Sequence, residues 1–226
     1  GVDLRSRLPI SAMDGIGGND ISFATAAGEV FAKAEAPYAD IGGTTTDVAL
    51  LRGGMRVIEI TLRTDAALDV IRQIAAEVPQ MVVGAGSLRE AGHVAAVKAV
   101  GASYGVAPGY TDALLDAAEE SDLPMIPGAA TPSEMMHLYE RGYTLQKFFP
   151  AELAGGIPFL KAVGAPLPEL SFVPTGGIDA KLAEKYLELP NVFAVGGSWL
   201  TPRSLLDDGD FDAIGKLAAD AARLGM

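Results

Sequence analysis

The sequence contains no cysteine among its 226 residues and only two histidines, His93 and His137. Without thiolates the chain cannot form disulfides, iron–sulfur clusters or cysteine-ligated zinc sites. The two histidines share no short motif, so a histidine-rich metal site is excluded as well. Magnesium held by carboxylates and water stays compatible with the composition. The residue counts therefore leave no obvious transition-metal site.

Basic residues are also scarce, with 17 Lys and Arg against 29 Asp and Glu, which gives a formal net charge of −12. This charge argues against a nucleic-acid partner and against anionic membrane surfaces, because both bind basic faces. No stretch of about 18 uninterrupted apolar residues occurs, so we expect no membrane span. The N-terminus lacks a basic region followed by an apolar core, so we expect no signal peptide. The resulting expectation is a cytoplasmic protein.

From about residue 55 onwards, short β-rich runs alternate with longer helical patterns. Most of the β-rich runs end in Gly, Pro or Ser, as strands that enter loops do. The predicted strands are residues 56–63, 80–86, 103–108, 123–128, 144–150, 171–177 and 192–198. The predicted helices are residues 64–77, 88–100, 110–120, 132–141, 156–163 and 180–188. Helix starts are indicated at Thr64 and Asp65, from Thr131 to Glu134, and at Asp179.

A series of strands that each lead into a helix or turn predicts a parallel β/α protein. An eighth strand is needed to close a barrel, and residues 29–36 (EVFAKAEA) are the best candidate, followed by a helix over residues 44–51. A (β/α)8 TIM barrel typically has about 250 residues and at least about 200. The 226 residues therefore fit a single such domain with short loops, and residues 1–28 would form an irregular or helical extension. An open, doubly wound sheet is the alternative fold.

Polar and apolar residues alternate in the predicted strand over residues 56–63. Glu59, Thr61 and Arg63 share one face by the period-two rule. In β/α barrels the active site gathers at the carboxyl ends of the strands. Both faces of a parallel sheet are normally covered, so a buried Glu and Arg there need partners or a ligand. An antiparallel strand with one face in water would show the same pattern, but a parallel barrel makes Glu59 and Arg63 candidate site residues.

One lysine, Lys147, stands inside the apolar run LQKFFP over residues 145–150. Burial on such a strand disfavours the charged ammonium form and favours the neutral, nucleophilic amine. The same pattern fits a lysine whose amine reaches water at a strand edge, or one half of a structural ion pair. The residue pattern leaves these alternatives open.

Glycine pairs follow the last two predicted strands, as TGG at residues 175–177 and GGS at residues 196–198. Glycine lets backbone amides approach an oxyanion closely, and Ser198 adds a hydroxyl. Phosphate sites of barrels often lie in the loops after the seventh and eighth strands, although glycine pairs are also ordinary turn signals. A third strand end of small residues, 84–87, presents the hydroxyl of Ser87 for binding a carboxylate.

Seven segments stand in order between residue 57 and residue 200. They are VIEITLRT (57–64), VGAGS (83–87), APGYT (107–111), IPGAATPSE (126–134), KFFPAE with the glycines after it (147–156), VPTGGI (173–178) and VGGSWL (195–200). In this order they resemble the 2-keto-3-deoxy-6-phosphogluconate (KDPG) / 4-hydroxy-2-oxoglutarate (KHG) aldolase family. The resemblance covers residues 50–226, and chance would not supply KFFPAE, PTGGI and GGSW in register.

The resemblance implies a class I aldolase, a carbon–carbon lyase that uses a lysine imine and no metal or other cofactor. It would cleave 2-dehydro-3-deoxy-6-phosphogluconate to pyruvate and glyceraldehyde 3-phosphate, and also 4-hydroxy-2-oxoglutarate to pyruvate and glyoxylate. The resemblance also implies a homotrimer of (β/α)8 barrels. The implied roles are Schiff-base formation by Lys147, acid/base catalysis by Glu59, binding of the substrate carboxylate by Arg63 and Ser87, binding of the distal phosphate by Gly176, Gly177 and Ser198, and support of the site by Thr175 and Pro108.

The sequence departs from the family pattern at two places. Ser87 stands where the family usually has Thr, and residues 29–36 are less apolar than the family's first strand. Residues 40–47, DIGGTTTD from Asp40 to Asp47, look like the phosphate loop of hydantoinases and actin-like ATPases, so a nucleotide-binding protein is one alternative. A catalytically weakened scaffold barrel is another alternative. A sugar-phosphate isomerase or epimerase, which has no covalent lysine, is the third.

The assigned phosphate loop makes a testable prediction about Ser198→Asp. The added carboxylate repels the distal phosphate, so we expect cleavage of the phosphorylated substrate to fall far more than cleavage of the unphosphorylated one. Steady-state kinetics with both substrates measures the difference. Equal losses with the two substrates would contradict the role assigned to Ser198.

Overall fold

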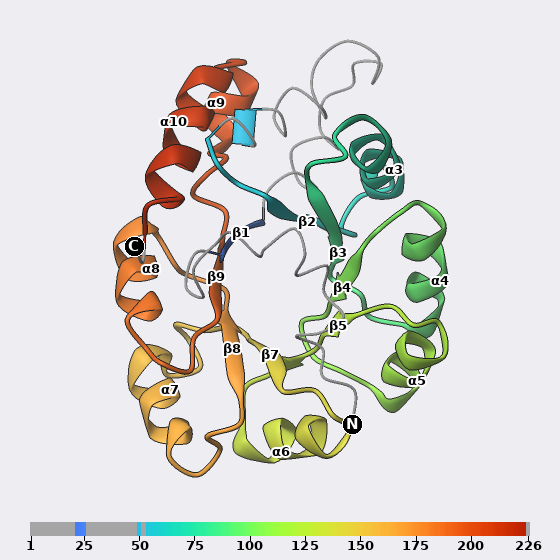
Figure 1. The fold of residues 1–226 in the computed structure, drawn as a ribbon, viewed down its shortest axis with the longest axis vertical. Helices are drawn as coiled ribbons and strands as arrows, with labels where there is room; N and C mark the ends of the chain where they lie inside the picture. The colour runs from blue at the N-terminus through green and yellow to red at the C-terminus, as the bar shows by residue number, and fades with distance from the viewer. Residues whose placement is uncertain (1–20, 26–48, 51–52, 225–226) are drawn as a thin grey trace.

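The computed structural model describes residues 21–25, 49–50 and 53–224. Its strands form a ring, and helices surround the ring on the outside (Figure 1). All the pairings between the described strands are parallel. The parallel β/α architecture predicted from the alternating pattern is therefore confirmed.

The strands form two sheets that continue one another around the ring. The first has the order β5-β4-β3-β2-β1-β9 and the second the order β6-β7-β8. The bounds in chain order are β1 (Ile21–Thr25), β2 (Val57–Thr61), β3 (Val82–Gly86), β4 (Tyr104–Val106), β5 (Met125–Ile126), β6 (Gly128–Ala129), β7 (Leu145–Phe148), β8 (Ser171–Pro174) and β9 (Ala194–Gly197).

Two junctions join these sheets into a closed barrel. On one side, isolated bridges pair Phe172 with Val192 and Thr175 with Gly196, which connects β8 to β9. On the other side, β5 and β6 are the two halves of one strand, separated by Pro127, whose carbonyl accepts a hydrogen bond of 2.9 Å from the backbone N–H of Lys147. The closed ring is the (β/α)8 barrel expected from the sequence, and it excludes the open, doubly wound sheet.

The strand that closes the barrel between β2 and β9 is β1, five residues that we predicted to belong to an irregular or helical extension. That prediction was wrong. Ala24 lies opposite Ile58 of β2 and opposite Gly197 of β9, so β1 is paired on both sides. The segment ISFAT is rich in β-forming residues but very short, and pairing with two neighbours determines its structure more than its own pattern does. The predicted strand 29–36 and the ATPase-like residues 40–47 lie outside the described residues, as does most of the predicted helix 44–51.

The predicted helices are confirmed, and their ends differ from the prediction by a few residues. They are α3 (Ala67–Glu77), α4 (Ala91–Ala99), α5 (Asp112–Glu120), α6 (Pro132–Glu140), α7 (Gly156–Gly164) and α8 (Ala180–Leu187). Two further helices follow β9 and were not predicted, α9 (Arg203–Asp207) and α10 (Phe211–Ala221). Within the residues that the structure describes, no helix is long and apolar enough to cross a membrane.

Two of the three predicted helix starts are confirmed by their caps. Thr131 and Glu134 form a reciprocal capping box at the start of α6, and Asp179 accepts a hydrogen bond of 2.8 Å from Leu182 N–H at the start of α8. The prediction of a helix start at Thr64 and Asp65 was wrong, because α3 begins after Ala66, which makes no side-chain cap. In place of a side-chain cap, a backbone hydrogen bond of 3.2 Å runs from Ala67 N–H to the carbonyl of Thr64.

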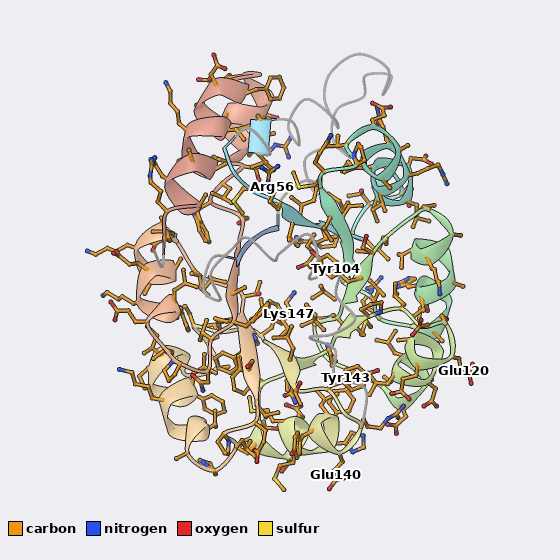
Figure 2. The ribbon with its side chains drawn as sticks, in the orientation of Figure 1. Arg56, Tyr104, Glu120, Glu140, Tyr143 and Lys147 are labelled. Atoms are coloured by element: carbon orange, nitrogen blue, oxygen red, sulfur yellow. The ribbon has the colours of Figure 1, made fainter. Side chains whose placement is uncertain are left out.

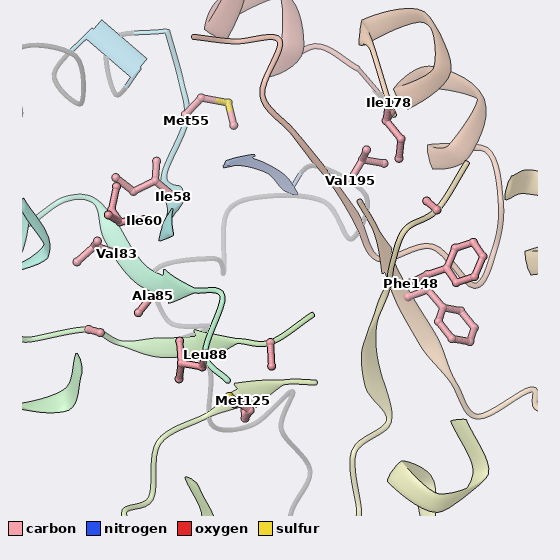
Figure 3. Packing of buried hydrophobic residues seen from close by; sticks show 14 of the residues in the cluster. Met55, Ile58, Ile60, Val83, Ala85, Leu88, Met125, Phe148, Ile178 and Val195 are labelled. Carbon is pink, nitrogen blue, oxygen red and sulfur yellow. The ribbon is translucent and has the colours of Figure 1, made fainter. Parts of the chain in front are cut away.

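The apolar side chains divide between two layers, since successive side chains of a strand point to opposite faces. The outer layer packs the barrel against the helices, and Figure 3 shows Val83, Ala85 and Phe148 within it. The inner layer fills the interior of the barrel toward the amino ends of the strands. It consists of Val57, Tyr104, Val106, Ile126, Leu145, Val173 and Ala194.

This inner layer is the floor on which the candidate site stands. Glu59 comes two residues after Val57 on β2, and Lys147 comes two residues after Leu145 on β7. Both side chains therefore point into the barrel, one level above the floor and toward the carboxyl ends of the strands.

Candidate functional site

Lys147 occupies the middle of the site. Its side chain projects from β7 toward the centre of the barrel (Figure 2) and is only 7% exposed. A lysine that reached water at a strand edge would be much more exposed, so that alternative is excluded. The side chain instead ends 3.7 Å from Glu59, measured from Nζ to Oε1.

Glu59 faces this amine from β2, on another part of the barrel wall, and its side chain is 5% exposed. The distance of 3.7 Å is too long for a hydrogen bond, and Oε1 of Glu59 has no hydrogen-bond partner among the described residues. A buried ion pair without hydrogen bonds is weak evidence for stabilisation, because desolvation of both charges opposes folding. The geometry therefore favours a functional pair over a structural one.

Gly86 at the end of β3 creates the space that the carboxylate of Glu59 occupies. A Cβ atom at this position would lie 1.9 Å from Glu59 Oε1 and 2.6 Å from Glu59 Cδ. Real atoms do not approach so closely, so any side chain at position 86 would displace the carboxylate. The sequence showed that this strand ends in small residues. It did not show that the carboxylate of Glu59 occupies the space that a side chain at position 86 would need.

Tyr104 lies below the pair and is fully buried. Figure 2 shows its side chain inside the barrel, and its hydroxyl donates a hydrogen bond of 2.8 Å to the carbonyl of Ile58, next to Glu59. Gly84 leaves room for the ring, since a Cβ there would lie 2.2 Å from it. Burial, and to a smaller extent the charge of Glu59, raises the pKa of Tyr104 well above its ordinary value. Tyr104 therefore stays a neutral donor that fixes the backbone beside Glu59, a contribution that we had not predicted.

Phe149 is a second residue of the site that the sequence analysis did not single out. Nζ of Lys147 lies 5.3 Å from the centroid of its ring, within the range of a cation–π contact. The same ring packs against the next strand end, where a Cβ at Gly176 would lie 3.3 Å from it. The apolar run KFF signalled burial, but not which neighbour each ring would contact.

The predicted carboxylate-binding residues follow neighbouring strands at the same end of the barrel. Arg63 follows β2, is exposed, and donates a hydrogen bond of 3.2 Å from Nε to Oγ1 of Thr61. Ser87 follows β3 and has a φ of +61°, a left-handed conformation that turns the chain sharply after the strand. The predicted supporting residue Pro108 follows β4 at the same end of the barrel. Its carbonyl oxygen lies 2.3 Å from the point that a Cβ of Gly128 would occupy.

The predicted phosphate-binding residues lie on two loops that run side by side. Gly176 and Gly177 have φ angles of +105° and +79°, which favour glycine strongly. The bridge between Thr175 and Gly196 brings the loop after β8 beside the loop after β9, where Ser198 is exposed. Gly196 makes room for Oγ1 of Thr175, which would lie 2.5 Å from a Cβ at that position.

Together these features suit chemistry on a carbonyl compound. A shielded amine can attack a carbonyl carbon, and a carboxyl group 3.7 Å away can move protons to and from the adduct. The described residues contain no group of three or more His, Cys, Asp and Glu side chains that could hold a metal ion.

Comparison with known protein sequences identifies close relatives. The family model of KDPG and KHG aldolases matches residues 39–217. A 2-dehydro-3-deoxy-phosphogluconate aldolase of Pseudoalteromonas atlantica is 49% identical over 173 residues, which are 76% of this chain and 80% of that protein. A KHG/KDPG aldolase of Escherichia coli is 47% identical over 173 residues, which are 76% of this chain and 81% of that protein.

Solved structures match the barrel as well. The KDPG aldolase of Zymomonas mobilis, determined with 3-phosphoglycerate, has a TM-score of 0.82 and 33% identity, and the match covers 98% of this chain and 97% of that one. The KDPG aldolase of Legionella pneumophila, with pyruvate captured as a covalent carbinolamine intermediate, has a TM-score of 0.80 and 36% identity. That match covers 89% of this chain and 94% of the other.

The contact between Gly86 and Glu59 can be tested with Gly86→Ala. The new methyl group pushes the carboxylate away from Lys147, so we expect borohydride to trap pyruvate on Lys147 about tenfold more slowly or worse. Mass spectrometry at timed intervals follows the trapping. Gly92→Ala is the matched control, because a Cβ at Gly92 meets no atom within 4 Å. Trapping by Gly86→Ala at the rate of the unmodified protein would show that the position of Glu59 does not matter.

Proposed function

Because this chain belongs to the KDPG and KHG aldolase family, we propose that Lys147 is its Schiff-base lysine and Glu59 its proton carrier. The chain is a class I aldolase, a lyase that cleaves a carbon–carbon bond. The observation that carries the two residue assignments is the buried contact of 3.7 Å between Nζ of Lys147 and Oε1 of Glu59.

The reaction begins when the carboxylate of Glu59 takes a proton from the ammonium group of Lys147. The neutral amine then attacks the C2 carbonyl carbon of the 2-oxo acid. The tetrahedral product is a carbinolamine, the kind of species captured with pyruvate in the Legionella pneumophila enzyme. Glu59 then gives a proton to the hydroxyl of the carbinolamine, which leaves as water, and a protonated imine remains. The nitrogen of this imine carries the positive charge that the next step needs.

Cleavage uses the protonated imine as an electron sink. The carboxylate of Glu59 takes the proton of the C4 hydroxyl, the C3–C4 bond breaks, and its electron pair moves into an enamine while the aldehyde leaves. Glu59 returns a proton to C3 of the enamine, and hydrolysis of the imine then releases pyruvate. One carboxyl group can serve all these transfers because Oε1 makes no competing hydrogen bond with the described residues.

The ends of the substrate would be held at two different strand ends. We assign its carboxylate to Arg63 and Ser87, and its distal phosphate to the backbone of Gly176 and Gly177 with the hydroxyl of Ser198. Thr175 and Pro108 would support these loops. The positive φ angles of the two glycines support the phosphate assignment, since such turns present backbone N–H groups to anions.

We propose 2-dehydro-3-deoxy-6-phosphogluconate as the main substrate and 4-hydroxy-2-oxoglutarate as a second one, as the names of the relatives suggest. A sugar-phosphate isomerase or epimerase would form no covalent bond to a lysine, so reductive trapping of pyruvate distinguishes it from an aldolase. A weakened scaffold barrel would have no reason to keep Glu59 and Lys147 in contact. The homotrimeric assembly stays an implication of the family resemblance, and the cytoplasmic location stays a prediction from the sequence.

Reduction with borohydride in the presence of pyruvate tests the proposed function. We expect a mass increase of one reduced pyruvate, located on the peptide that contains Lys147, and no increase in Lys147→Met, because the imine needs that amine. Lys161→Met on α7 is the matched control, since Lys161 is exposed and should leave the adduct unchanged. The absence of an adduct at saturating pyruvate, or an adduct that survives in Lys147→Met, would overturn the proposal.

A further inference from the structure

Glu152 belongs to the segment that leads from Lys147 on β7 to α7, and the reaction described above gives it no role. This segment runs along the loop after β8. Ala151 N–H donates a hydrogen bond of 2.9 Å to the carbonyl of Thr175, and Glu152 N–H donates one of 3.3 Å to the carbonyl of Gly176. These two backbone hydrogen bonds therefore connect the segment after Lys147 to the loop that we assign to the distal phosphate.

The side chain of Glu152 also packs against this loop. A Cβ atom at Gly177 would lie 3.1 Å from both Cβ and Cγ of Glu152, so the stem of the glutamate lies directly against the glycine. Gly177 has a φ of +79°, a conformation that glycine adopts as one of several in a free chain. A side chain packed against this glycine restricts the alternatives that are open to the turn.

Tyr186 holds Glu152 in place from a third element. It is fully buried on α8, and its hydroxyl donates a hydrogen bond of 2.5 Å to Oε1 of Glu152. Burial first, and then this hydrogen bond, raises the pKa of Tyr186, so the hydroxyl stays protonated and keeps donating. A Cβ at Gly156 would lie 3.2 Å from Glu152 Oε1 and 3.3 Å from the hydroxyl of Tyr186, so this glycine leaves room for the bond.

We propose that Glu152, anchored by Tyr186, is a positioning residue that sets the Gly176–Gly177 turn at a fixed place relative to Lys147. This inference rests on the proposed function, because it needs the turn to bind the distal phosphate while Lys147 holds C2. A short stretch of chain then fixes both anchor points of the substrate. Binding energy from the phosphate can thus be used to place C2 and the C3–C4 bond at the reacting groups.

A positioning role and a merely structural role of Glu152 affect phosphorylated and unphosphorylated substrates differently. Loss of the anchor should loosen the glycine turn and weaken the phosphate contacts. The pair of Lys147 and Glu59 stands on β7 and β2 and should keep its geometry. Cleavage of an unphosphorylated substrate and trapping of pyruvate would therefore stay near normal, whereas general destabilisation would lower every activity together.

The experiment compares Glu152→Ala, Glu152→Gln and Tyr186→Phe with the unmodified protein, using 2-dehydro-3-deoxy-6-phosphogluconate and 4-hydroxy-2-oxoglutarate. We expect Glu152→Ala and Tyr186→Phe to raise KM for the phosphorylated substrate about tenfold, with less than about twofold change for the other, since one lost fixed contact is of this order. Glu152→Gln keeps an acceptor for Tyr186 and should restore most of the loss. Glu184→Ala, an exposed glutamate on the same helix as Tyr186, is the control for removal of a carboxylate.

The outcomes are distinguishable from failure of the proposed function. If the unmodified protein neither traps pyruvate nor cleaves the phosphorylated substrate, the proposed function fails. If it does both and Glu152→Ala and Tyr186→Phe leave KM unchanged, or lower both activities equally, only the positioning role is overturned. Should Glu152→Ala not fold, Tyr186→Phe decides, because it removes only the hydroxyl and keeps the buried ring.

Discussion

A lysine amine and a glutamate carboxylate meet inside the barrel without a hydrogen bond between them, 3.7 Å apart and almost fully shielded from water. Both groups lose hydration there, which costs free energy, so the structure around the pair has to hold it in place. The apolar floor below and the closed ring of strands provide that support. Tyr104 donates a hydrogen bond to the backbone beside Glu59, and the absence of a side chain at Gly86 leaves room for the carboxylate.

Side-chain alternation and the order of the strands in the parallel barrel determine the geometry of this pair. Alternation along each strand places Glu59 one level above Val57 and Lys147 one level above Leu145. Their strands are not neighbours, so the two side chains reach toward one another across the interior instead of along one sheet. The two groups thus come from distant parts of the chain, while the floor under them is one continuous apolar cluster. The loops above can vary with the substrate without disturbing the pair.

The sequence predicted those parts of the fold and site that depend on local pattern. Strand alternation singled out Glu59, the apolar run LQKFFP singled out Lys147, and capping residues located the starts of α6 and α8. The short strand β1 was missed, because five residues carry little pattern and its structure depends on two neighbouring strands.

Relations between distant residues could not be predicted either. Nothing near Gly86 in the sequence shows that a side chain there would collide with Glu59, because the two residues meet only when β2 and β3 pair. The bond from Tyr186 to Glu152 spans 34 positions and depends on how α8 packs. Family resemblance transferred roles to matching positions, but it did not supply the physical reasons for the residues around them.

The central claim is that Glu59 moves protons to and from a substrate held on Lys147. Exchange of the methyl protons of pyruvate for deuterium in heavy water measures this transfer directly, without cleavage of a carbon–carbon bond, and NMR follows it. We expect the unmodified protein to catalyse the exchange and Glu59→Gln to lose roughly 100-fold or more of the rate, because the amide cannot carry the proton. Exchange at an undiminished rate in Glu59→Gln would contradict the account.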